Sequence, residues 1–185
     1  MDTLTSPGLN PAEQLELSAW RAVGRHADMG QLLTELALSS GWQRAALVHV
    51  EPLAGAVQTV AATARGLDSA NRRVLAVQEL KAFQRWCDGK GVSRVVSPES
   101  SPLAAVVPNG WRHPSTALAL AVSDGDKREV ALGVLWIQPP QEPSLVGGLR
   151  GPLTHALSQA LPSQQGVRAE STASDPYSSR PSGEN

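Results

Sequence analysis

Two apolar segments separated by a tight-turn signal place the strongest constraint on this chain. Residues 116–123 and 129–138 are rich in apolar and β-branched side chains, and Asp124-Gly125 lies between them. An Asp-Gly pair between two such runs favours a short turn that joins antiparallel strands. We therefore expect a β-hairpin over residues 116–138 and an antiparallel sheet in the fold.

A second hairpin is expected over residues 44–64. Residues 45–50 are nearly apolar on both faces, which is typical of a strand buried on both sides. Pro52–Gly55 has turn composition, and the β-branched residues that follow favour a return strand. The two hairpins supply four strands, and residues 92–96 form a short fifth.

Helical spacing of apolar residues predicts two helices before the first hairpin. Asn10 precedes Pro11 and is suited to cap the first helix, because Asn accepts hydrogen bonds at a helix start and proline fits the first turn. Asp28 is suited to cap the second helix, and Gly41 to end it, because glycine tolerates a left-handed backbone.

Two more helices are expected later in the chain. The third begins at Asp68 or Ser69 and ends near Lys90, with Arg72-Arg73 on its solvent face. Residues 97–114 are rich in Ser and Pro and read as loop, with one helical turn at 103–107. The last helix covers residues 149–161.

Length and composition indicate one domain with flexible ends. We expect a flexible lead-in at residues 1–10, a single domain at 11–161 and a disordered tail at 162–185, where Ser, Gln, Gly and Pro dominate. Such a tail buries too little apolar surface to offset the entropy that it loses on ordering.

Charge and cysteine usage exclude several classes of function. The formal net charge is −1 and no basic cluster stands out, so we expect no nucleic-acid partner and no anionic membrane surface. No apolar run approaches the ~20 residues that span a bilayer. Cys87 is the single cysteine, which excludes an internal disulfide and a multi-thiolate metal site. Together with an N-terminus that lacks a secretory pattern, this favours a cytoplasmic protein.

Three stretches resemble the GAF domain family. Residues 26–36 are similar to its lead helix, with a small residue, Asp28 and the Leu32-Leu33 pair. Residues 42–52 resemble its first strand, with Arg44-Ala45-Ala46 followed by apolar residues, an acid and proline. Residues 115–122 and 130–135 resemble its late hairpin. The resemblance implies an α/β domain of the α+β type, with a central antiparallel sheet, the N- and C-terminal helices on one face and a helix and loop layer on the other. PAS and roadblock-type scaffolds remain alternatives.

The resemblance also implies a ligand pocket between the sheet and the third helix with its following loop. Aromatic, imidazole and guanidinium groups are suited to hold a planar or anionic ligand. The candidate ligand-binding residues are His49, Phe83, Trp86, Trp111, Arg112 and His113. His49 has a second interpretation, as a core histidine or one at the sheet edge, and Trp111 as a lid over the core.

The sequence identifies no cofactor, no metal site and no catalytic site. The Asn-Lys-Phe-Asp-Glu type motif of cyclic-nucleotide GAF domains is absent, and Cys87 is followed by Asp88 rather than the histidine usual in bilin-binding members. The GAF-type methionine-sulfoxide reductases need several cysteines, one to attack the sulfoxide and another to resolve the oxidised first cysteine. A chain with Cys87 alone cannot supply both. No nucleophile elbow, phosphate loop or zinc-helix motif occurs. We therefore expect no enzyme activity.

Three functions remain to be separated. The first is a sensor that binds an unidentified small ligand and signals through its terminal helices. The second is an interaction module with a filled pocket, which dimerises through the same helices and forms a piece of a larger regulator. The third is an enzyme that uses Cys87 or a histidine. Leu17, Trp20 and Leu145 have no obvious place in the core, so we expect them at a homodimer interface.

Overall fold

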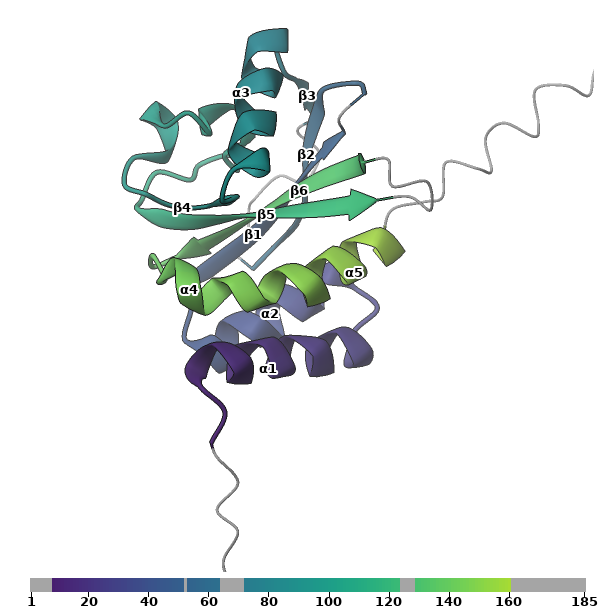
Figure 1. Ribbon diagram of the computed structural model, residues 1–185, viewed down its shortest axis with the longest axis vertical. Helices are drawn as coiled ribbons and strands as arrows, with labels where there is room; N and C mark the ends of the chain where they lie inside the picture. Colours follow the sequence, from purple (N-terminus) through teal and green to yellow (C-terminus); the bar gives the residue numbers. More distant parts are fainter. Residues whose placement is uncertain (1–7, 52, 64–71, 124–128, 161–185) are drawn as a thin grey trace, which may run out of the picture.

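The computed structural model describes residues 8–51, 53–63, 72–123 and 129–160 (Figure 1). The predicted turn residues Asp124-Gly125 and the predicted tail at 162–185 lie outside these ranges. Within them the chain forms one six-stranded sheet in the order β3-β2-β1-β6-β5-β4, with every neighbouring pair antiparallel. The strands are β1 (Arg44–Glu51), β2 (Ala56–Ala62), β3 (Arg73–Val74), β4 (Val92–Val95), β5 (Ser115–Ser123) and β6 (Glu129–Gln138).

Both predicted hairpins are confirmed. The first is β1–β2 and the second is β5–β6, and they meet in the middle of the sheet where β1 pairs with β6. In that central pair Val48 lies opposite Val134, and His49 lies opposite Gly133. The predicted fifth strand is β4, at the sheet edge beside β5.

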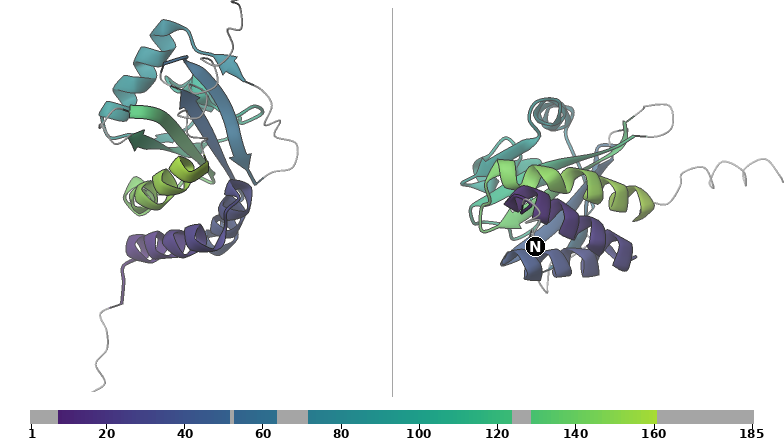
Figure 2. Two further views of the ribbon diagram at one scale, coloured as in Figure 1. Left: turned by 90° about the vertical axis from the view of Figure 1, so that its right-hand side faces the viewer. Right: turned by 60° about the horizontal axis from the view of Figure 1, so that its bottom comes forward.

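The terminal helices cover one face of the sheet, as expected. They are α1 (Pro11–Arg25), α2 (Met29–Ser40), the short α4 (Pro143–Val146), the 3-10 turn η3 (Gly147–Leu149) and α5 (Arg150–Ala160). Figure 2 shows α2 and α5 against the sheet, with α1 lying across the pair. Their buried side chains and those of the strands beneath form a continuous apolar core that includes Leu32, Leu36, Leu47, Leu120, Leu135, Leu153 and Leu157.

The predicted caps of α1 and α2 are also confirmed. The Asn10 side chain accepts a hydrogen bond from the backbone N–H of Glu13, whose carboxylate accepts one from Asn10 N–H in return. Asp28 accepts from the N–H of Gln31. Gly41 ends α2 with φ at 70°, a conformation that costs glycine little.

A helix and loop layer covers the opposite face. It consists of α3 (Val77–Asp88) and of the loop that carries the 3-10 turns η1 (Pro98–Ser100) and η2 (Ala104–Val106). The core beneath this layer includes Val48, Val50, Val57, Phe83, Leu103, Val106, Trp111, Val134 and Trp136. The expected fold class is therefore observed: an α+β domain with helices on one face and a helix and loop layer on the other.

The start of the third helix differs from the prediction. Asp68 and Ser69 lie outside the described residues, and α3 begins at Val77, with Ala76 as its cap residue. Arg73 and Val74 form β3 instead, paired with β2 at Val57 and Ala56. The expectation that Arg72-Arg73 lie on a helix surface is therefore wrong. The apolar spacing of this segment favours a helix, but its pairing with the distant strand β2 decides its structure.

Among the described residues, no helix is both long enough and apolar enough to cross a bilayer. The same ranges hold no group of three or more His, Cys, Asp or Glu side chains suited to a metal ion.

Candidate functional site

Aromatic side chains fill the space where the sequence predicted a ligand. Phe83 of α3 and Trp111 of the loop before β5 are each 1% exposed, and Trp136 of β6 is fully buried. All three belong to the core between the sheet and α3, together with Leu103 and Val106 of the loop around η2. The centre of this layer is therefore packed with side chains.

Each indole N–H in this layer has an internal acceptor. Trp136 Nε1 donates to the carbonyl oxygen of Val106 at 3.1 Å, and Trp111 Nε1 donates to Ser115 Oγ at 2.6 Å. Trp86 Nε1 donates to Ser93 Oγ at 2.8 Å. Buried indoles need such partners, and with them satisfied these tryptophans act as packing groups.

A polar cluster at the start of β1 holds Trp111 in place. The Arg44 guanidinium lies over the Trp111 ring, 4.6 Å from its centroid, a distance typical of a cation–π contact. Ser115 Oγ also donates to the His113 carbonyl and accepts from Gln138 Nε2. The interpretation of Trp111 as a lid over the core fits this geometry better than a ligand-facing indole.

His49 lies on the other face of the sheet. His49 of β1 lies directly opposite Gly133 of β6, and residues that are opposite each other in antiparallel strands share one face of the sheet. A Cβ added to Gly133 would lie 2.7 Å from Leu157 of α5, so this shared face is the one that the terminal helices cover. The predicted grouping of His49 with Phe83 and Trp111 in one pocket is therefore wrong, and so is the sheet-edge alternative, since β1 is central. Its Nε2 atom is buried and has no hydrogen-bond partner within the described residues. Desolvation by burial lowers the pKa of His49, which favours the neutral ring.

The remaining predicted ligand residues are dispersed. Arg112 and His113 are exposed, and Arg112 pairs with Glu99 at 3.4 Å on the surface. Trp86 is half-buried, with its ring centroid 6.0 Å from that of Phe83. It lines a hollow of about 400 Å³ between α3, β4 and the η1 loop. The six residues therefore do not form one site.

Sequence reasoning missed a small polar pocket beside the filled core. Its volume is about 210 Å³, below the range of ~300–1,000 Å³ of typical ligand sites. Val48, Val57 and Val107 give it apolar walls, while its polar groups come from Thr59, Arg72, Arg73 and Asn109. The pocket was missed because residues 72–73 were expected on the solvent face of a helix. A two-residue strand is too short to give a periodic pattern in the sequence.

The two arginines of this pocket differ in their partners. Arg72 pairs with Glu51 at 3.3 Å. Arg73 donates to the Ala104 carbonyl at 3.3 Å and forms no ion pair within the described residues. Desolvation lowers the pKa of Arg73, and the negative charge of Glu79 partly offsets this effect.

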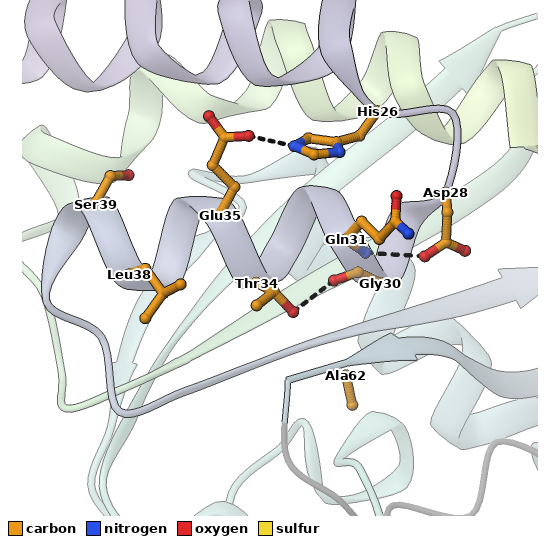
Figure 3. A pocket seen from close by; sticks show the side chains of 9 residues that line it. All are labelled: His26, Asp28, Gly30, Gln31, Thr34, Glu35, Leu38, Ser39 and Ala62. Carbon is orange, nitrogen blue, oxygen red and sulfur yellow. Dashed lines mark hydrogen bonds and ion pairs between the residues drawn. The ribbon is translucent and has the colours of Figure 1, made fainter.

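A further hollow lies elsewhere, along the outer side of α2 (Figure 3). It is an open groove of about 760 Å³ that includes Leu38, which is 81% exposed. Its polar groups already have partners: Asp28 caps α2, Thr34 donates to the Gly30 carbonyl, and Glu35 contacts both His26 and Arg25. The groove therefore offers few spare groups to a polar ligand.

The predicted interface residues lie on or near α1. Leu17 and Trp20 are 39% and 42% exposed on its outward face. The Trp20 ring leans on α5, 5.7 Å from the His155 ring, and an added Cβ on Gly151 would meet it at 3.7 Å. Leu145 of α4 is half-buried and packs against the core of the terminal helices, so the expectation that it has no place in that core is wrong.

No family model and no curated protein matches the sequence. Similar solved structures do exist. The GAF domain from an Acinetobacter phosphoenolpyruvate-protein phosphotransferase aligns with a TM-score of 0.56 at 12% identity, covering 83% of this chain and 96% of that one. Free methionine-R-sulfoxide reductase from Neisseria meningitidis, solved with its substrate, aligns at 0.52 and 14% identity, covering 86% and 97%.

A methyl-accepting chemotaxis protein, residues 122 to 287, aligns with a TM-score of 0.51 at 12% identity, covering 82% of this chain and 98% of that one. At these identities the likeness concerns the fold and not the activity. The alignments span nearly the whole of each similar chain and more than four fifths of this one. The chain has the GAF fold.

Proposed function

We propose that this chain is a regulatory GAF domain that acts by forming a homodimer through α1 and the start of α5, and not by enclosing a large ligand. The observation that carries the proposal is the filled layer between the sheet and α3, where Phe83, Trp111 and Trp136 are buried. A filled centre of this kind leaves no room there for a drug-sized molecule, and the hollow of about 400 Å³ beside Trp86 lies next to the edge strand β4. Of the functions separated by sequence, the interaction module fits this packing best.

The exposed side chains of α1 support a contact surface there. Leu17 and Trp20 lie together on the outward face, and Trp20 is held against α5. Large aromatic side chains that are fixed before binding are effective anchors at interfaces. A two-fold axis would bury this patch against its own copy.

A structural link connects the surface to the opposite layer. Arg150, the first residue of α5, donates to the carbonyls of Lys90 at 3.0 Å, Gly91 at 3.3 Å and Ala119 at 3.1 Å. These bonds tie the turn after α3 and strand β5 to the helix that supports Trp20. A change at α3 is therefore able to shift the terminal helices, which is how such a domain would regulate a larger protein in the cytoplasm.

The dimer is tested by removing its apolar contacts. The variant with Leu17→Glu and Trp20→Ala is expected to be monomeric at micromolar concentration, while the native chain is dimeric, because a charge replaces one contact and the other is deleted. Light scattering gives the mass of each. Leu38→Glu, an exposed leucine on α2, is the matched control and should stay dimeric. A monomeric native chain, or a double variant that keeps the dimer, would contradict the proposal.

The pocket beside Arg73 favours a second candidate function, the sensing of a small anion. Arg73 brings an exposed positive charge at the wall of the pocket, and Thr59 and Asn109 bring neutral hydrogen-bonding groups. A carboxylate or phosphate would supply the acceptor oxygens that the guanidinium lacks. The volume of about 210 Å³ restricts the ligand to a few atoms.

Inorganic phosphate is the probe for this pocket. Millimolar phosphate is expected to raise the melting temperature of the native chain by a few degrees, because a ligand that binds only the folded state stabilises it. Arg73→Gln should abolish this rise, whereas Arg94→Gln, which removes an exposed arginine of β4, should preserve it. Chloride at equal ionic strength controls for screening. An equal rise in all three proteins would contradict specific binding.

We assign no catalytic role to Cys87 in this proposal. The side chain is half-buried at the end of α3 and packs against the core beneath that helix. A cysteine in such a position is more often a packing group than a nucleophile. The reductase activity of the similar Neisseria structure is accordingly not carried over to this chain.

A further inference from the structure

The outward face of α1 carries opposite charges on either side of its exposed apolar residues. Glu16 and Arg21 flank Leu17 and Trp20, and both charged side chains are exposed. Within the described residues neither Glu16 nor Arg21 forms an ion pair. The charged groups on this face are thus without ion-pair partners in the described part of the chain, while Trp20 rests on α5 and stays 42% exposed.

The spacing of the exposed residues on α1 matches the line of contact between two paired helices, which we call the seam. Glu13, Leu17, Trp20 and Gly24 are separated by four, three and four residues, so they line one stripe of α1, and all four are exposed. At 3.6 residues per turn, Glu16 lies on one side of this stripe and Arg21 on the other. Their separation of five residues is that of the flanking positions that pair across parallel helices.

We propose that the occupant of this face is a second copy of the chain, packed with its α1 parallel to the first, so that Glu16 of each copy pairs with Arg21 of the other. The arrangement rests on the homodimer proposed above and specifies its orientation. Leu17 and Trp20 form its centre, and the two-fold axis runs along the helix pair, which generates two equivalent ion pairs.

Charge complementarity favours the parallel arrangement over the antiparallel one. In parallel helices, the flank that carries Arg21 faces the partner's flank that carries Glu16, so opposite charges meet on both sides of the seam. In antiparallel helices, each flank faces its own copy, which directs Glu16 toward Glu16 and Arg21 toward Arg21. Like charges placed across an interface disfavour that orientation. The parallel pair places Glu13 opposite its own copy, but this residue lies at the outer end of the stripe and its carboxylate accepts a hydrogen bond from Asn10 N–H.

The surroundings of α1 leave the seam accessible. The helix packs on α2, α5 and η3, and the residues of its stripe are exposed. On the inner side, Glu16 approaches η3 closely, since an added Cβ on Gly148 would lie 3.2 Å from Glu16 Cβ. Around Gly24, at the far end of the stripe, an added Cβ would meet no atom within 4 Å. A side chain introduced there points into open space, where the second copy would lie.

Charge reversal tests the pairing of Glu16 with Arg21. Glu16→Arg and Arg21→Glu should each raise the dimer dissociation constant by roughly tenfold, because two exposed attractions become two repulsions. The double variant restores opposite charges across the seam and should return to within about twofold of the native value. Sedimentation analysis at several protein concentrations gives the constants, and the melting temperatures show whether each variant is folded.

A cysteine at the end of the seam reports the orientation directly. In a Cys87→Ser background, Gly24→Cys is expected to form an intermolecular disulfide under mild oxidation, because parallel helices bring the two copies of residue 24 together. In an antiparallel pair centred between Leu17 and Trp20, these positions lie about 16 Å apart along the helices, too far for a disulfide. Adding Leu17→Glu removes the dimer and should abolish the cross-link.

The outcomes separate this inference from the homodimer itself. A monomeric native chain overturns both. A dimer that charge reversal does not weaken, that the double variant does not restore, or that fails to cross-link at residue 24 overturns the parallel arrangement and leaves the homodimer standing. Weakened single variants, a restored double variant and a cross-link at residue 24 together support the parallel pair.

Discussion

Replacing Trp136 by alanine is expected to lower the free energy of unfolding by about 3–5 kcal/mol, the usual cost of deleting a large buried aromatic side chain. Trp136 is fully buried in the middle of the sheet, between the central strand β1 and strand β5. The variant loses the apolar contacts of the indole, leaves a cavity against α3 and its loop, and removes the donor that satisfies the Val106 carbonyl. Urea denaturation of both proteins measures the difference.

Two companion measurements connect this loss to the filled pocket. Trp136→Phe keeps most of the apolar volume and should cost less than half as much. Indole at millimolar concentration is expected to raise the melting temperature of Trp136→Ala and not that of the native chain, because an apolar cavity that the protein cannot collapse binds a molecule of its own shape. If Trp136→Ala were nearly as stable as the native chain, the indole would not be a core element and the case for a filled layer would fail.

Local signals determined how much of the fold was predictable. The caps at Asn10 and Asp28 and the left-handed end at Gly41 depend on residues within one helical turn, and all three were predicted correctly. Both hairpins are local in the same sense, since each joins strands that are adjacent in sequence. Short-range chemistry is therefore enough to place these elements.

The start of α3 was not predictable because it depends on a distant pairing. Val74 and Leu75 continue the helical spacing of Val77, so the sequence pattern alone favours a longer helix. In the structure, β3 pairs with β2 at Ala56 and Val57, and Leu75 is buried beneath α3. A contact between residues 16 and 18 positions apart leaves no periodic pattern in the sequence.

The candidate site was harder to predict than the fold, because β1 is apolar on both faces. Alternation shows that Ala45, Leu47 and His49 share one side, but not which helices cover that side. The pairing of β1 with β6 and the packing of α5 decide it, and they place His49 away from Trp111. The position of Trp136 was predictable from the sequence, because it is two residues after Val134 in the strand and therefore lies on the same face, toward α3.

The packing of α5 against the sheet requires a glycine at position 133, so a larger residue there is expected to cause the second large loss of stability. Gly133 lies in β6 opposite both His49 and Leu120, and an added Cβ would be 2.7 Å from Leu157 Cδ2 and 3.4 Å from Leu120 Cβ. Leu157 is fully buried, so its methyl group has little space to move. Glycine permits α5 to pack directly on the centre of the sheet.

Gly133→Val is therefore expected to reduce the free energy of unfolding by about 2–3 kcal/mol, although valine favours strands more than glycine does. Urea denaturation gives the value. Ala121→Val, on an exposed site of β5, is the matched control and should change stability by less than about 0.5 kcal/mol.

A double variant identifies the clash as the cause. Leu157→Ala removes the methyl group that Gly133→Val would displace, so the combined variant should be more stable than the sum of the two single losses predicts. Strictly additive losses would mean that the valine acts elsewhere in the strand. Because α5 supports Trp20, Gly133→Val alone should also weaken the proposed dimer, whereas Ala121→Val should not. If Gly133→Val left the dimer dissociation constant unchanged, the packing of α5 on the sheet would not determine the position of Trp20 on α1.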